Sequence, residues 1–201
     1  MNAKTLITAL VLFGMAPTQG SASELPEVLK RSFVAKGQAG LDRLEQDPTQ
    51  KACSQAGAVT GAAAAEIIAA NQASIRYPSD GQWLGDWRAG EAIAQRGTGK
   101  QFSDDPTEPS GGNCYACHQL APDEIAYGTI GPSLKAYGKL RGRGEAVLRY
   151  TWGKIYNPQA YFPCSGMPRF GHQQILTEQQ IRDVMALLFD PESPVNRDSS
   201  P

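Results

Sequence analysis

The chain has no long apolar run beyond its N-terminal segment, no excess of positive charge and only four cysteines. A membrane-spanning helix needs about 20 consecutive apolar residues, and no later segment approaches that length. Lysine and arginine together number 19 against 20 acidic residues, so nothing indicates a nucleic-acid-binding surface. No internal repeat is visible. These absences predict a soluble globular protein with neither a nucleic-acid nor a membrane partner.

Residues 1–22 have the organisation of a secretory signal peptide. Lys4 lies in a short basic region, and the apolar stretch from Leu6 to Met15 is too short to span a bilayer. Small residues at Gly20–Ala22 suit a signal peptidase. A retained anchor is the alternative, which the polar residues after the stretch disfavour. We therefore expect export to an oxidising compartment such as the bacterial periplasm.

Two of the four cysteines belong to a C-x-x-C-H run, from Cys114 to His118. This spacing lets two thiols form thioethers to the vinyl groups of one haem, with the adjacent imidazole as the proximal iron ligand. We predict one covalently bound haem c, attached through Cys114 and Cys117 and ligated by His118. The alternative is a thiol oxidoreductase that uses the same two cysteines, which would need a βαβ pattern around them. The sequence has no such pattern.

The second axial ligand must come from the few side chains that bind haem iron. Two of the four methionines fall within residues 1–22, and Met185 lies on the apolar stripe of the last predicted helix. Met167 remains, in a loop rich in glycine and proline, while His172 and Cys164 are chemically legitimate alternatives. Ligation by histidine and methionine raises the reduction potential and leaves no open position, which predicts electron transfer rather than substrate binding.

Residues 83–201 are predicted to form an all-α domain with a class I cytochrome c fold. Its first helix begins after Asp86, a suitable N-cap, and contains Gly90, which permits a close approach by another helix. Its last helix begins after Thr177, which forms a capping box with Gln180 and precedes an apolar stripe of period three to four. Crossing of the first and last helices is the core of such a fold.

Residues 23–82 contain none of the haem chemistry and are predicted to be a helical N-terminal extension. Apolar spacing predicts short helices at residues 25–33, 41–46 and 58–72, and the second is expected to stop before Asp47-Pro48. The segment is too polar to form a strong core alone. We expect it to pack on the haem domain or on a partner.

The run from Gly128 to Leu134 resembles the loop that wraps the proximal side of the haem in class I cytochromes c. That resemblance implies that the Pro132 carbonyl accepts the Nδ1 hydrogen of His118 and so fixes its tautomer. An ordinary turn proline is the alternative, because Gly-Pro dipeptides mark turns in many proteins.

Further along, the chain is similar to the SoxX cytochromes, the small c-type subunits of the thiosulfate-oxidising SoxAX complex. The similarity is carried by the haem motif with the Gly-Gly-Asn before it and by the segments Tyr150–Pro158, Pro163–Gly171 and Leu176–Ile181. It implies three partners: a SoxA-like catalytic cytochrome with one or two haems, a SoxYZ-like carrier protein, and a small acceptor cytochrome c.

The resemblance also implies a role in an L-cysteine S-thiosulfotransferase, in which thiosulfate is oxidatively joined to a cysteine of the carrier protein. This chain would be the electron-transfer subunit, with an electron-exit haem held by Cys114, Cys117, His118 and Met167, and no catalytic nucleophile of its own. A free-standing diffusible cytochrome c is the alternative. The helical extension and the aromatic-rich segment after residue 149 argue against it, since a shuttle needs neither.

The two cysteines outside the haem motif, Cys53 and Cys164, are predicted to form a disulfide. Export to an oxidising compartment and the even number of cysteines outside the haem motif favour pairing. The bridge would tether the N-terminal extension to the loop that carries Met167. A free Cys164 thiol facing the haem or a partner is the alternative, since sequence alone gives no distance between the two sulfurs.

Overall fold

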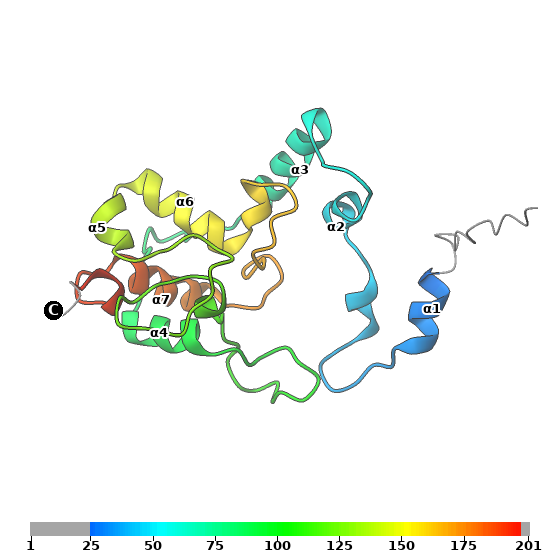
Figure 1. Cartoon of the computed structure of the whole chain (residues 1–201), viewed down its shortest axis with the longest axis horizontal. Coiled ribbons are helices and arrows are strands. Elements are labelled where there is room, and N and C mark those ends of the chain that lie inside the picture. Colours follow the sequence, from blue (N-terminus) through cyan, green and yellow to red (C-terminus); the bar gives the residue numbers. More distant parts are fainter. Residues whose placement is uncertain (1–24, 198–201) are drawn as a thin grey trace, which may run out of the picture. The chain divides into compact units, whose positions relative to one another are not determined.

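The computed structural model describes residues 25–197, in which the regular secondary structure is helical apart from one isolated β-bridge, as the sequence predicts (Figure 1). The α-helices are α1 (Leu25–Ser32), α2 (Pro48–Cys53), α3 (Gly61–Ala73), α4 (Trp87–Gln95), α5 (Tyr137–Arg141), α6 (Glu145–Tyr156) and α7 (Glu178–Phe189). Short 3-10 helices are η1 (Leu41–Leu44), η2 (Cys114–Ala116), η3 (Pro158–Ala160) and η4 (Pro194–Asn196). Among the described residues, no helix is long and apolar enough to cross a membrane. The predicted signal peptide, residues 1–22, lies outside the described residues.

The chain divides into two compact units, residues 1–34 and residues 35–201. In the first unit, α1 matches the helix predicted at residues 25–33 and carries an exposed ion pair of 3.2 Å between Lys30 Nζ and Glu27 Oε1. The second unit contains the haem motif and also most of the predicted extension. The division of the chain at residue 82 remains a prediction.

Helices α4 and α7 cross in the second unit, as expected for the core of this fold (Figure 1). Gly90 lies at the crossing, where an added Cβ would be only 2.1 Å from the backbone oxygen of Asp183. The Asp86 side chain accepts a hydrogen bond from the backbone N–H of Arg88 and caps α4. Local capping thus starts the helix, and the missing side chain of Gly90 lets its partner approach.

Helix α7 supplies most of the core of this unit. It begins with the predicted capping box, in which Thr177 and Gln180 satisfy each other's backbone N–H groups, and it ends at Phe189. Its buried side chains include Met185, which is 0% exposed. Trp152 of α6 is equally buried and donates from Nε1 to the Arg76 carbonyl over 2.8 Å. Trp152 is therefore a core residue.

The extension differs from its sequence prediction at one helix. Residues 41–44 form η1, and α3 covers most of the range predicted at 58–72, but Pro48 begins α2 rather than ending a helix. Asp47 is the N-cap, and it forms a capping box with Gln50. Proline is favoured in the first turn, where its missing N–H needs no partner. The prediction that the second helix stops before Asp47-Pro48 is confirmed, whereas α2 was not predicted.

A buried chain of polar side chains attaches the extension to the rest of the second unit. The Asn71 amide donates to Thr49 Oγ1 of α2 over 3.0 Å, and the Asn157 amide donates to Asn71 Oδ1 over 2.8 Å. Near it, the Gln72 amide donates to the Ala160 carbonyl over 3.1 Å, where α3 packs against η3. Earlier in the extension, the Gln38 amide donates to the Asp104 carbonyl over 3.1 Å. The expectation that the extension packs on the haem domain thus holds for its residues in the second unit.

Candidate haem site

The C-x-x-C-H motif forms a tight turn that follows a segment hydrogen-bonded to the C-terminal end of α4. The backbone N–H groups of Cys117 and His118 both donate to the Cys114 carbonyl, over 3.1 and 2.9 Å. This turn brings the three motif side chains together within five residues. The preceding Gly112 N–H donates to the Ile93 carbonyl over 2.8 Å and thereby fixes the turn to α4.

Glycine is required next to this turn for steric reasons. A Cβ on Gly111 would be 1.9 Å from the Arg96 carbonyl oxygen, and one on Gly112 would be 3.2 Å from the Cys114 sulfur. Asn113 follows with φ of 45°, in the left-handed region where asparagine is tolerated. The segment Gly111–Asn113 therefore packs closely against the end of α4 and leads the chain into the haem motif.

The two motif thiols suit haem attachment better than disulfide exchange. Both Cys114 and Cys117 are free and half-buried. Burial raises the pKa of the Cys114 thiol to about 12, whereas redox-active C-x-x-C pairs depend on a thiol whose pKa is lowered. Among the described residues the only β pairing is a bridge between Lys36 and Ala39, so a βαβ unit around the motif is absent from that part of the chain. Both observations disfavour the oxidoreductase alternative.

The proximal histidine is held by the loop that follows the motif. The His118 Nδ1 atom lies 2.7 Å from the Pro132 carbonyl oxygen. A carbonyl can only accept, so this contact assigns the hydrogen to Nδ1 and leaves Nε2 as the nitrogen that can ligate iron. Gly131 lies directly against the ring, where a Cβ would be 2.2 Å from His118 Cε1.

The same loop is joined to the motif by a ladder of backbone hydrogen bonds. The N–H of Gly128 donates to the Tyr115 carbonyl, that of Gly131 to the Cys117 carbonyl, and that of Leu134 to the Gln119 carbonyl, each over 2.8 Å. Three bonds of this kind make the position of Pro132 a property of the fold rather than of one turn. The structure therefore brings Pro132 and His118 together as the sequence resemblance implies.

The distal candidate Met167 is half-buried and packs against the hydrophobic core. It lies in the loop between η3 and α7, where its backbone N–H donates to Ser165 Oγ over 3.3 Å. Met185, by contrast, is fully buried within α7. Among the methionines of the described residues, Met167 is the one on a loop, which keeps it the preferred candidate for the sixth ligand.

The two alternative distal ligands have other partners. Cys164 is bridged to Cys53, with an S–S distance of 1.99 Å and a Cα–Cα distance of 5.4 Å, so it has no thiolate to offer. His172 is half-buried; burial and the nearby Arg169 charge lower its pKa, against an opposing effect of Asp47. A neutral imidazole could still bind iron, and His172 stays the second candidate.

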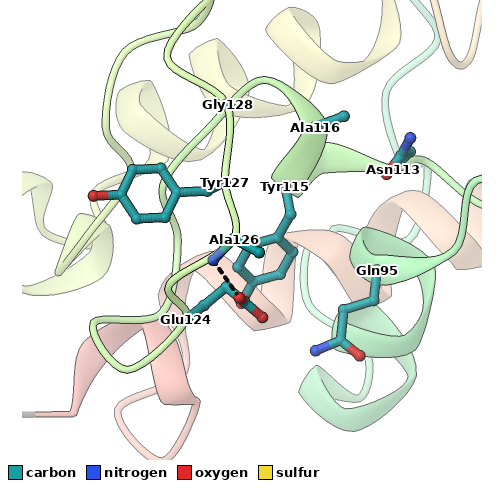
Figure 2. Close-up of a pocket in the computed structure, with 8 residues that line it drawn as sticks. All are labelled: Gln95, Asn113, Tyr115, Ala116, Glu124, Ala126, Tyr127 and Gly128. Atoms are coloured by element: carbon teal, nitrogen blue, oxygen red, sulfur yellow. Dashed lines mark hydrogen bonds between the residues drawn. The ribbon is translucent and has the colours of Figure 1, made fainter.

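An open pocket of about 620 Å³ lies next to the motif turn (Figure 2). It is lined by Gln95, Asn113, Tyr115, Ala116, Glu124, Ala126, Tyr127 and Gly128. Figure 2 shows the Tyr115 side chain extending from the turn toward the segment that contains Glu124. The Glu124 carboxylate accepts a hydrogen bond from the Ala126 N–H over 2.7 Å. The lining includes none of the predicted haem-bonding side chains, so this pocket is beside the haem site and not part of it.

The residues of the site fit a haem c. Two free thiols, an imidazole whose Nδ1 is already hydrogen-bonded and a thioether on a loop are the donor set that such a group uses. Sequence reasoning found all of these residues. It missed Gly131 as the residue that admits the imidazole, and Arg169 as a buried charge in the same loop as Met167. Only the glycine left a trace, in the Gly-Pro dipeptide.

Comparison with known proteins gives three findings. The sequence profile of the family described as cytochrome c matches residues 98–189. An uncharacterized lipoprotein of Aquifex aeolicus (strain VF5) is 43% identical over 157 residues, which cover 76% of this chain and 73% of that protein. Among solved structures, a chain of the SoxXA crystal structure from P. pantotrophus is 26% identical, with a TM-score of 0.39, over 58% of this chain and 89% of that one.

Proposed function

Since this chain belongs to the cytochrome c family and is a c-type cytochrome that carries electrons on a covalent haem c, we propose that it is the electron-transfer subunit of a SoxAX-like L-cysteine S-thiosulfotransferase. The bound haem supplies reversible one-electron chemistry at iron. The chain's own residues attach it through Cys114 and Cys117 and ligate it through His118 and Met167.

The observation that carries the electron-transfer role is the proximal arrangement. The Pro132 carbonyl accepts a hydrogen bond from His118 Nδ1 over 2.7 Å. This bond raises the basicity of Nε2 and fixes the plane of the ring. With Met167 as the second axial ligand, no position is left open for a substrate. Such a centre passes electrons and does not bind thiosulfate.

The cysteine inventory supports a division of labour between two subunits. All four cysteines have a use, because two belong to the haem motif and two are joined in a disulfide. No thiol is left to act as a nucleophile or to carry sulfur. When a carrier cysteine thiolate joins thiosulfate, one S–S bond forms and two electrons are released, so that bond formation belongs to a catalytic partner and this chain takes the electrons one at a time.

The SoxX assignment itself rests on sequence similarity. The similar segment Tyr150–Pro158 covers the end of α6 and the first residue of η3, and Pro163–Gly171 belongs to the loop that carries Met167. The proposed partners are a SoxA-like catalytic cytochrome, a SoxYZ-like carrier and a small acceptor cytochrome c. The proposed location is the periplasm, reached through the signal peptide of residues 1–22.

Co-expression with a SoxA-type cytochrome tests this function. We expect a one-to-one complex by size-exclusion chromatography and, after addition of thiosulfate and a reduced carrier protein, reduction of the haem of this chain together with a mass increase of the carrier by one thiosulfate adduct. The control is the catalytic cytochrome alone, which should transfer fewer electrons to the acceptor. A fully redox-active monomer that binds no such partner would contradict the proposal and favour a free-standing carrier.

A further inference from the structure

Helix α2 is joined to the Met167 loop at both of its ends. At the start of α2, Asp47 Oδ2 lies 2.6 Å from Arg169 Nη2. At the last residue of α2, Cys53 is bridged to Cys164. Met167 lies between the two attachment points, three residues after one and two residues before the other. The six-residue helix and the loop therefore form a closed ring that includes the candidate ligand Met167.

The ion pair in this ring is buried on the side of the loop. The Arg169 side chain is 6% exposed, whereas that of Asp47 is 31% exposed. A buried guanidinium cannot lose its proton and needs a compensating charge, so removal of the partner from such a pair is strongly destabilising. This makes the contact unlike an exposed surface ion pair, whose contribution is near zero.

One carboxylate performs two functions at this point. Asp47 Oδ1 accepts a hydrogen bond from the Gln50 N–H over 2.8 Å and caps α2, while Oδ2 binds Arg169. Burial alone would raise the pKa of Asp47, but the Gln50 hydrogen bond and the Arg169 charge outweigh it and hold the pKa below its ordinary value. The group is thus a carboxylate at neutral pH, and the start of the helix and the loop share one anchor.

The anchor is itself fixed to the interior. Thr49, in the first turn of α2, is buried and accepts a hydrogen bond from the Asn71 amide over 3.0 Å. Asn71 is in turn bonded to Asn157, the residue that follows α6. Any movement of the Met167 loop away from the core would have to break the ion pair, stretch the disulfide, or pull α2 from this buried network.

We propose that Asp47 and Arg169 are positioning residues for the sixth haem ligand, which together with the Cys53–Cys164 bridge hold the Met167 loop from both flanks and keep the thioether on iron. The inference rests on the proposed ligation by Met167. It assigns a function to the N-terminal extension, which an ordinary diffusible cytochrome does not need.

The test uses the oxidised holoprotein and the rate at which imidazole or cyanide replaces the native sixth ligand. In Asp47→Asn the side chain can still cap α2 but no longer compensates Arg169. We expect ligand replacement to become faster by about tenfold or more, because loop opening precedes exchange and a buried pair has been broken. Arg169→Lys keeps the positive charge and should stay within a few-fold of the wild type. The double variant Asp47→Asn with Arg169→Gln should be no faster than Asp47→Asn alone.

A matched control exists elsewhere in the fold. Asp80 also accepts a backbone hydrogen bond, from Gln82 over 3.0 Å, and pairs with Arg182 over 2.9 Å, but it has no link to the distal loop. Asp80→Asn should lower thermal stability without changing the rate of ligand replacement. An equal acceleration in Asp80→Asn, or none in Asp47→Asn, would overturn the inference and leave the proposed function intact. A ferric haem ligated by methionine has a weak far-red charge-transfer band. If Met167→Ala keeps this band, both the inference and the proposed ligation are wrong.

Discussion

In the proposed haem site, single residues define the two axial positions. His118 is fixed by a carbonyl acceptor, and Met167 is presented by a loop. Both depend on side-chain chemistry that cannot be replaced by a residue of similar size: an imidazole with two distinct nitrogens and a thioether that remains neutral and binds iron.

Replacement of Met167 by alanine should abolish the weak far-red charge-transfer band of the oxidised protein and lower the reduction potential, because the axial thioether is lost. Absorption spectroscopy and a redox titration of the holoprotein measure both effects. Met185→Leu is the matched control, since Met185 is fully buried in α7 and should leave the band unchanged. Persistence of the band in Met167→Ala would make His172 the first candidate.

Replacement of Gly131 by alanine should raise the reduction potential and reduce the yield of holoprotein. The added methyl group would lie 2.2 Å from His118 Cε1, so the loop must move and the hydrogen bond from Nδ1 to Pro132 must weaken. A less basic imidazole stabilises oxidised iron less. Gly144→Ala is the control, because nothing lies within 4 Å of the added Cβ. An unchanged potential in Gly131→Ala would argue against control by Pro132.

At the scale of the elements, the crossing of α4 and α7 supports the haem motif. The segment that leads into the motif turn is hydrogen-bonded to the end of α4. The position of that helix therefore determines the position of Cys114. Helix α7 in turn holds α4 at a distance that only glycine permits at position 90. The site is therefore coupled to a helix packing contact that contains no haem ligand.

Gly90→Ala should destabilise the holoprotein by about 1–3 kcal/mol, the usual cost of overpacking in a tight contact. The sign is informative, because the same change in an open helix would stabilise it by up to about 1 kcal/mol through helix propensity. Denaturant unfolding followed by circular dichroism measures the difference. A stabilised variant would show that the two helices do not approach as closely as 2.1 Å between Cβ and the Asp183 oxygen implies.

At the scale of the second unit, the Cys53–Cys164 disulfide closes the longest covalent loop of the chain outside the haem. The two residues are 111 positions apart. For a loop of that length the chain-entropy account gives about 4.7 kcal/mol of stabilisation, an upper figure because the haem attachment already restricts the unfolded chain. The bridge also connects the extension to the loop that carries Met167. With Met167 as the proposed sixth ligand, we expect stability and ligation to be coupled.

Alkylation of the denatured holoprotein without reductant should add no label to Cys53 or Cys164, which intact-mass analysis detects directly. Replacement of both residues by alanine should lower the free energy of unfolding by up to about 4.7 kcal/mol and weaken the methionine charge-transfer band at temperatures where helix content is unchanged. Two added labels on the wild-type protein, or a band lost only on global unfolding, would contradict this coupling.

Local signals in the sequence determined the haem attachment and the helix ends. The C-x-x-C-H run requires only neighbouring residues, and the caps at Asp86 and Thr177 act within one turn, so both could be read without a fold. Helix α2 was not predicted, because Pro48 serves equally as a stop signal or as a first-turn residue and a weak local signal cannot choose between them. The all-helical class followed from the apolar periodicity together with the caps and the haem motif.

Tertiary structure decided which residues that are distant in sequence lie next to each other. The pairing of Asp47 with Arg169, the contact of Gly131 with the His118 ring and the burial of Trp152 join segments between 13 and 122 residues apart or depend on the packed core as a whole. No periodicity or cap encodes such distances, because they result from packing that buries apolar surface and leaves each buried charge only the partners within reach. The chemistry of the predicted haem site was therefore readable in the sequence, whereas the contacts proposed to hold its sixth ligand in place required the fold.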